Sequence, residues 1–124
     1  MALYLSVRTI MQKNRELLDL LDPLEDVLSF DLTAHLLGVS REQLFKYDAL
    51  SEDIPSHVEA RVRFLNAVCG YLLGAYNDDG IRAWFLRKRV QLDNKSPAGV
   101  LSGEWNPDDA KPRAVLKLAR QLIS

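Results

Sequence analysis

The spacing of the apolar residues is the feature that most constrains the fold of this chain. Within residues 56–73 the apolar positions recur at alternating intervals of four and three: Val58, Val62, Leu65, Cys69 and Leu72. This rhythm places them on one face of an α-helix, and strand-length alternation of apolar and polar residues is scarce in the chain. We therefore expect an all-α protein whose longest and most central helix covers residues 56–73.

Proline and capping residues divide the chain that precedes this helix. A first helix is expected over residues 9–21, and Pro23 is expected to restart the chain as a short helix through Leu28. Asp31 is then the expected N-cap of a helix that Gly38 ends.

Cap and turn residues also predict the remaining helices. Ser40, with Gln43 three residues later, has the spacing of a capping box and predicts a helix that runs to about residue 50. After the long helix, polar turns predict helices over residues 81–88, over residues 97–101 and from residue 110 to the C-terminus.

The composition indicates a globular domain without a membrane segment. The chain has 124 residues, of which 48% are hydrophobic and 27% are charged. Its single cysteine, Cys69, cannot form an internal disulfide, and the first residues do not have the pattern of a signal peptide. The longest mostly apolar stretch, residues 67–76, is far shorter than the roughly 20 residues that span a bilayer. We expect a cytoplasmic protein.

The net charge of −1 is a cancellation between two oppositely charged halves. Residues 1–57 carry five basic and ten acidic residues, a net charge of −5, whereas residues 58–124 carry eleven basic and seven acidic residues, a net charge of +4. No strong overall field draws the molecule to nucleic acid or to an anionic membrane. Any binding to DNA must therefore depend on a local patch.

The residue inventory gives no candidate for catalysis, for a metal site or for a cofactor site. His57 precedes Cys69 by twelve residues on the expected long helix, which separates them by about 18 Å. His35 is not paired with another ligand at a spacing that zinc sites use. We expect no enzymatic activity, and the simplest role for Cys69 is that of a small core residue.

Residues 31–47 have the pattern of a helix-turn-helix. Ala34 is small enough for two helices to cross closely, Gly38 permits a tight turn, and Leu44 follows the cap of the second helix by four residues. In such a unit the start of the second helix enters the major groove of DNA. The candidate DNA-binding residues are Ser40, Arg41, Gln43, Lys46 and Tyr47. The sequence leaves open whether this unit reads DNA or serves only as a scaffold.

The C-terminal half combines apolar anchors with a basic cluster. The apolar anchors of a small irregular core are expected to be Trp84, Leu92, Pro97 and Leu101. The basic cluster consists of Arg87, Lys88, Arg89 and Lys95. It suits an acidic partner surface or phosphate, although a solvated face explains it as well. Trp105 lies in an expected loop, where it is either a lid over the core or an anchor in an interface.

The order of these features resembles the Xre/MbcA/ParS family of antitoxins over roughly residues 32–123. The N-terminal part of the resemblance is Leu37-Gly-Val-Ser-Arg followed by Leu44. The more specific part is the acidic turn at residues 77–80, the helix with Trp84, and then Leu92, a polar turn, Ser96-Pro and Leu101.

The resemblance implies an antitoxin of a type II toxin–antitoxin system. Such a protein is not an enzyme; it binds a RES-type toxin that degrades NAD, and its helix-turn-helix represses the shared promoter. The implied partners are the toxin, operator DNA, and a second copy in a homodimer or a heteromeric toxin–antitoxin complex. The candidate toxin-binding residues are Arg87, Lys88, Arg89, Lys95, Trp105, Lys117, Arg120 and Ser124.

The resemblance also implies a division of the chain into three regions. Residues 1–55 form N-terminal helices with the helix-turn-helix, residues 56–76 form a connecting helix, and residues 77–124 form the toxin-binding domain. The alternative function is that of a stand-alone helix-turn-helix transcriptional regulator, whose C-terminal domain serves dimerisation or binds some other protein.

Overall fold

The protein is all-α. The computed structural model describes the backbone of residues 2–122 and the side chains of residues 9–122. Within these residues it contains no strand and is built from α1 (Ala2–Leu28), α2 (Phe30–Leu37), α3 (Arg41–Asp48), α4 (Ser56–Leu72), α5 (Asp78–Leu86), the 3-10 helix η1 (Val90–Leu92), α6 (Pro97–Val100) and α7 (Ala110–Gln121). The all-α prediction is therefore confirmed.

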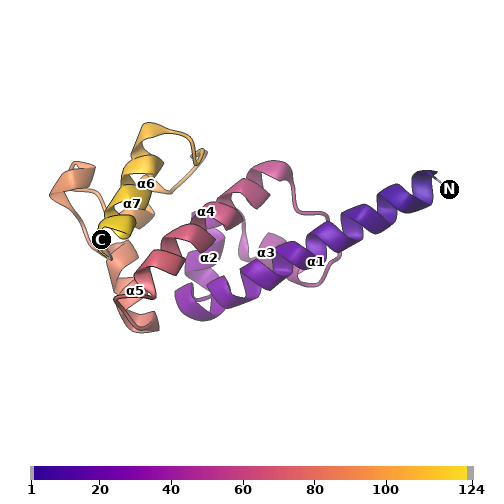
Figure 1. Ribbon diagram of the computed structural model, residues 1–124, viewed down its shortest axis with the longest axis horizontal. Coiled ribbons are helices and arrows are strands. Elements are labelled where there is room, and N and C mark those ends of the chain that lie inside the picture. The colour runs from indigo at the N-terminus through magenta and orange to yellow at the C-terminus, as the bar shows by residue number, and fades with distance from the viewer. Residues whose placement is uncertain (1, 123–124) are drawn as a thin grey trace.

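α4 is the central helix of the molecule. It packs against α1 and α2 on one side and against α7 on another, so it connects the N-terminal helices with the C-terminal ones (Figure 1). The prediction of a central helix in this region is confirmed, but α4, with 17 residues, is not the longest helix. The longest is α1, with 27 residues, and its start projects past the other helices (Figure 1).

α1 continues through Pro23, which corrects the prediction of two separate helices. A proline lacks the amide hydrogen that would bond to the carbonyl four residues earlier, here that of Asp19. The helix nevertheless continues because a single buried stripe passes the proline in phase: Leu17, Leu21, Leu24 and Leu28. Pro23 itself is exposed, so its ring has room on the outer face. The packing of the stripe outweighs the local preference of proline to end a helix.

α2 and α3 are joined by a short turn whose ends are capped. The N-cap of α2 is Ser29, whose hydroxyl accepts a hydrogen bond from the amide of Leu32, and not Asp31 as predicted. Gly38 ends α2 in the left-handed conformation, with φ 73°, as predicted. Ser40 caps α3 as predicted, because its hydroxyl accepts from the amide of Gln43 at 3.0 Å.

The buried residues of the C-terminal helices belong to one hydrophobic core that they share with the N-terminal helices, so the separate small core expected from the sequence is not present among the described residues. The predicted anchors Trp84, Leu92, Pro97 and Leu101 are all buried, which confirms that part of the prediction. α5 begins at Asp78, three residues earlier than predicted, because the side chain of Asn77 accepts a hydrogen bond from the amide of Gly80. α6 is the single turn predicted from Ser96-Pro97.

No described helix combines the length and the apolar character that a membrane crossing requires.

Candidate functional site

The polar residues on α3 are already bound to carboxylates of the same chain. Arg41 forms an ion pair with Asp31 at the surface. Gln43 donates a hydrogen bond to Glu52 at 2.7 Å, and Lys46 lies 3.6 Å from the same carboxylate group. The candidate DNA-binding surface is therefore close to neutral.

The other two candidate DNA-binding residues have roles within the fold. Tyr47 is 4% exposed and belongs to the hydrophobic core, so little of its side chain is available to a ligand. Ser40 is exposed, and its hydroxyl is the cap of α3. The half of the predicted capping box that runs from the amide of Gln43 to the Ser40 hydroxyl is present, and the side-chain nitrogen of Gln43 donates to Glu52.

The basic cluster differs from α3 because none of the described carboxylates is paired with it. Within the described side chains, the ion pairs involve Lys13, Arg41, Lys46, Arg63 and Arg82 as cations, and none of them involves the basic cluster. Arg87, Lys88 and Lys95 are exposed. The positive charge of this region is thus available to a partner.

Arg89 of the basic cluster is held in place by a small closed loop. Its backbone amide donates to the carbonyl of Lys95 at 3.1 Å, and its own carbonyl accepts from the amide of Asn94 at 2.9 Å. Asp93 and Asn94 close this loop in the left-handed conformation, with φ 56° and 63°. Such a conformation is less unfavourable for Asp and Asn than for most residues. The polar turn in the sequence therefore fixes the position of Arg89.

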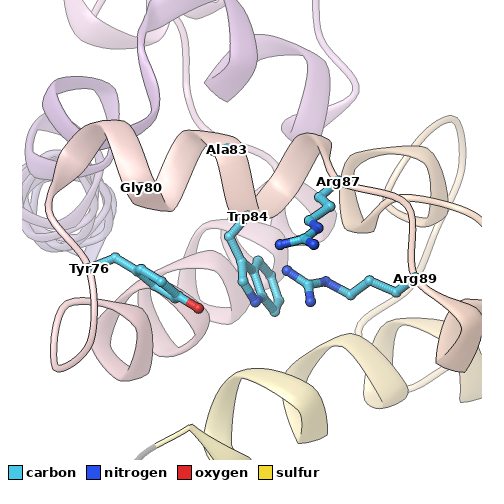
Figure 2. A pocket seen from close by; sticks show the side chains of 6 residues that line it. All are labelled: Tyr76, Gly80, Ala83, Trp84, Arg87 and Arg89. Atoms are coloured by element: carbon cyan, nitrogen blue, oxygen red, sulfur yellow. The ribbon is translucent and has the colours of Figure 1, made fainter.

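The side chain of Arg89 covers Trp84 at the edge of a pocket. The guanidinium carbon lies 4.9 Å from the centre of the Trp84 ring, a cation–π arrangement. We call this cavity of about 170 Å³ the Trp84 pocket; it is lined by Tyr76, Gly80, Ala83, Trp84, Arg87 and Arg89. Figure 2 shows the two guanidinium groups side by side next to the indole, with the Tyr76 hydroxyl directed toward the indole from the opposite side.

The Trp84 pocket is positively charged, because no described carboxylate forms an ion pair with Arg87 or Arg89. Burial lowers the pKa of Arg89; Tyr76 acts in the opposite direction and the positive charge of Arg87 lowers the pKa further. The Nε atom of Arg89 is buried and has no hydrogen-bond partner among the described residues. Two adjacent cations with a free buried donor are poised to accept an anion.

α7 carries a second basic surface at the same end of the molecule. Arg113, Lys117 and Arg120 recur at intervals of four and three, and they line one shallow hollow together with Ala110 and Ala114. α7 packs against η1 and α6, which brings this surface to the unit that also holds the basic cluster. Lys117 and Arg120 are exposed, as a partner-binding role requires. Ser124, also predicted to bind the toxin, lies outside the described residues.

Trp105 is the lid over the core, the first of the two roles that the sequence left open. Its side chain is 6% exposed, and its indole nitrogen donates to the carbonyl of Leu36 at 2.9 Å. Its ring packs edge-on against Phe64 with 5.2 Å between the ring centres. The buried side chain offers little surface to a partner, which argues against the prediction that Trp105 binds the toxin.

Two residues near these sites were not identified from the sequence. Tyr76 lines the Trp84 pocket but follows α4 in an irregular segment, where no periodicity marks it. Arg61 is 7% exposed and binds the backbone of Leu37 and Trp105. A sequence signal existed for Arg61, because it lies three residues after Val58 and four before Leu65 on the buried face of α4.

One group of carboxylates could hold a hard cation. Oxygen atoms of Asp22, Glu25 and Asp48 lie within 4.8 Å of one another between α1 and α3. Burial, a hydrogen bond with Asp48 and the neighbouring carboxylates raise the pKa of Glu25 to about 8. At neutral pH this group holds a proton, so it does not present a full set of charged ligands.

Cys69 is 3% exposed in the core. Burial raises the pKa of its thiol to about 12, so the reactive thiolate is disfavoured at neutral pH. This environment matches the role of a small core residue.

Comparisons of the chain with family models, with curated proteins and with solved structures found no match.

Proposed function

We propose that this protein is the antitoxin of a type II toxin–antitoxin pair, of the Xre/MbcA/ParS type, and that it neutralises a RES-type toxin by direct binding. The sequence resemblance suggests the class of partner. The observation that carries the proposal is the contrast between the two ends of the molecule. Cations on α3 are paired with carboxylates, whereas the basic cluster has no such partner among the described side chains.

The C-terminal end is the proposed toxin-binding surface. It comprises the basic cluster, Lys117 and Arg120, with Ser124 at the chain end. Unpaired exposed cations favour an acidic surface, and such complementarity raises the association rate and selects the partner. Neutralisation then requires no chemistry from this chain, because occupying the toxin's cleft is sufficient.

Repression of the shared promoter is the second part of the proposal, and α2 and α3 form the proposed helix-turn-helix. Gly38 and Ser40 set its turn, and Arg41 and Gln43 are the proposed base or phosphate contacts. DNA phosphates must compete for these side chains with Asp31 and Glu52, so we expect weak binding, and the small number of cations should make its dependence on salt shallow. The alternative, a stand-alone transcriptional regulator, depends entirely on this surface.

A homodimer is the third part, and we place its contact on the start of α1. Ile10 is 44% exposed and Met11 is 53% exposed, and both belong to the first half of α1, whose start projects past the body (Figure 1). Ile10 continues the spacing of the buried stripe that includes Leu17. A short helix without tertiary contacts is marginally stable in water, so packing against the same segment of a second copy would stabilise it.

Co-expression with a RES-type toxin tests the main proposal. The native host should encode such a toxin beside this chain, and this chain should relieve the growth arrest that the toxin causes. Changing Arg87, Lys88 and Arg89 together to alanine should weaken the complex, with a smaller dependence on salt than the unchanged protein has. A growth arrest that is unaffected by this chain would overturn the proposal.

The DNA role has a separate test with an internal control. Arg41→Ala combined with Gln43→Ala should abolish retardation of promoter DNA while neutralisation of the toxin is retained. If the double variant loses both functions while its circular dichroism spectrum is unchanged, the two surfaces have been assigned wrongly. If it keeps both, α3 does not read DNA.

A further inference from the structure

The Trp84 pocket combines two adjacent guanidinium groups with a cavity. Arg87 and Arg89 both line it, and Figure 2 shows their planar groups next to each other beside the indole of Trp84. Like charges at close range repel, and no described carboxylate forms an ion pair with either arginine. The charge of an anion placed between two such groups would offset this repulsion.

The donors of the pocket match an anion that carries more than one oxygen. Guanidinium groups present N–H donors in a planar fork, which suits two oxygens of one ligand. The buried Nε atom of Arg89 is a donor without a partner, and the hydroxyl of Tyr76 faces the pocket from the other side. The two guanidinium groups, on the side of the indole opposite to Tyr76, thus place several donors next to each other.

The walls of the pocket leave room for a group of limited size. The cavity of about 170 Å³ is bordered by Gly80 and Ala83, the small residues of α5. A Cβ atom on Gly80 would lie 3.0 Å from the Cβ atom of Tyr76, so a larger residue there would push Tyr76 aside by a few tenths of an ångström. The small residues therefore border the pocket without filling it.

We propose that the Trp84 pocket is a binding site for a phosphate monoester group. A phosphate carries a charge of about −1.5 to −2 at neutral pH and three acceptor oxygens, which matches two adjacent guanidinium groups better than a carboxylate of charge −1 does. The apolar face of Trp84 below Arg89 keeps that guanidinium in one orientation. This site goes beyond the proposed function, because the isolated chain binds the phosphate with no toxin present.

Calorimetric titration of the full chain tests the proposal. Inorganic phosphate is one titrant and adenosine monophosphate is the other, at constant ionic strength, with acetate as the carboxylate comparison. We expect saturable binding of phosphate, and acetate should bind at least about tenfold more weakly. Equal affinity for inorganic phosphate and the nucleotide assigns the site to the phosphate group alone, whereas tighter nucleotide binding extends the site to the base or sugar.

Matched variants locate the binding. Arg87→Gln and Arg89→Gln should each weaken phosphate binding at least about tenfold, as expected for the loss of a charge-assisted hydrogen bond. Lys88→Gln removes the same charge from an exposed neighbour that does not line the pocket, and it should stay within about twofold of the unchanged chain. Arg87 is exposed, so its variant reports binding even if Arg89→Gln disturbs the loop.

Two outcomes would overturn this proposal. The first is the absence of saturable binding by the unchanged chain at millimolar phosphate. The second is an equal loss of affinity in Lys88→Gln and Arg87→Gln, which would indicate diffuse attraction to the basic cluster. Neither outcome bears on neutralisation of a toxin, which the co-expression experiment measures independently.

Discussion

Arg61 donates two hydrogen bonds to the backbone carbonyl of Trp105, at 3.0 Å from Nε and 2.7 Å from Nη2, and its guanidinium also lies over the Trp105 ring. A third hydrogen bond runs from Nη1 of Arg61 to the carbonyl of Leu37 at 2.8 Å. Leu37 is the last residue of α2, where a positive charge is favourable. One buried arginine thus fastens α2 and the segment before α7 to α4.

Replacing Arg61 by methionine should destabilise the fold. Methionine keeps most of the length of the side chain, but it leaves the carbonyls of Leu37 and Trp105 buried without these donors. We expect the free energy of unfolding to fall by about 2–4 kcal/mol, measured by denaturant titration. Arg63→Met is the control, because Arg63 is exposed on the same helix and its pair with Glu59 should be worth at most about 1 kcal/mol. Equal losses of unfolding free energy in both variants would contradict the conclusion that the hydrogen bonds of Arg61 hold α2 and the segment before α7 against α4.

The helices of this chain were largely predictable because their apolar faces are continuous. The spacing from Val58 to Leu72 located α4, and Ser96-Pro97 located α6. Pro23 gave a false boundary, because a local rule for proline cannot weigh the packing of a stripe on both sides of it. Asp31 was wrongly predicted as the N-cap of α2, because the hydroxyl of Ser29 accepts the hydrogen bond from an amide at the start of this helix.

The candidate sites were less predictable than the helices, because side-chain pairing depends on residues that are distant in sequence. Arg41 and Lys46 have the spacing of DNA contacts, but only the fold reveals that Asp31 and Glu52 lie against them. The burial of Trp105 was hard to predict for the same reason, because its ring contacts Phe64 of α4 and its indole nitrogen donates to Leu36 of α2, both distant in sequence. In contrast, the basic cluster was recognisable from its sequence, since its members are close neighbours in the chain.

The stability of the protein should fall as the pH rises from about 4.5 to about 8. The pKa of Glu25 is raised from 4.5 to about 8, with burial as the largest cause, so the folded state holds a proton that the unfolded state releases. The stabilisation from this proton is complete below about pH 4.5 and is lost as the pH rises through about 8. The pKa of Asp48 is also raised, which contributes in the same direction.

The variant Glu25→Gln isolates this effect because it keeps an uncharged side chain of the same shape. Since Glu25 is only partly buried, we expect a modest rise of about 2–4 °C in the melting temperature at pH 8.5, and little change at pH 4.5. Glu16→Gln makes the same change at an exposed position of α1 and should leave the pH dependence as it is. If the melting temperature of Glu25→Gln depends on pH as that of the unchanged protein does, the folded state does not hold the proton on Glu25 that this prediction requires.

Replacing Pro23 by alanine should stabilise the protein. Alanine supplies the amide hydrogen that the carbonyl of Asp19 lacks, and it has a much higher helix propensity than proline. Part of this gain is offset because alanine gives the unfolded chain more freedom. We expect a net increase of about 1–2 kcal/mol in the free energy of unfolding, measured by denaturant titration. A decrease would mean that a bend at Pro23 is needed for α1 to pack.

Replacing Ile10 by glutamate should dissociate the proposed homodimer without unfolding the chain. Ile10 is 44% exposed in the first half of α1, so a charge there does not enter the core of one copy, whereas it would be buried between two. Sedimentation velocity should then show a monomer where the unchanged protein sediments as a dimer, with the same melting transition in dilute solution. Gln12→Glu, a control on an exposed polar position of the same helix, should remain dimeric. If the unchanged protein is monomeric at about 100 μM, or if Ile10→Glu remains a dimer, the two copies do not meet through the start of α1.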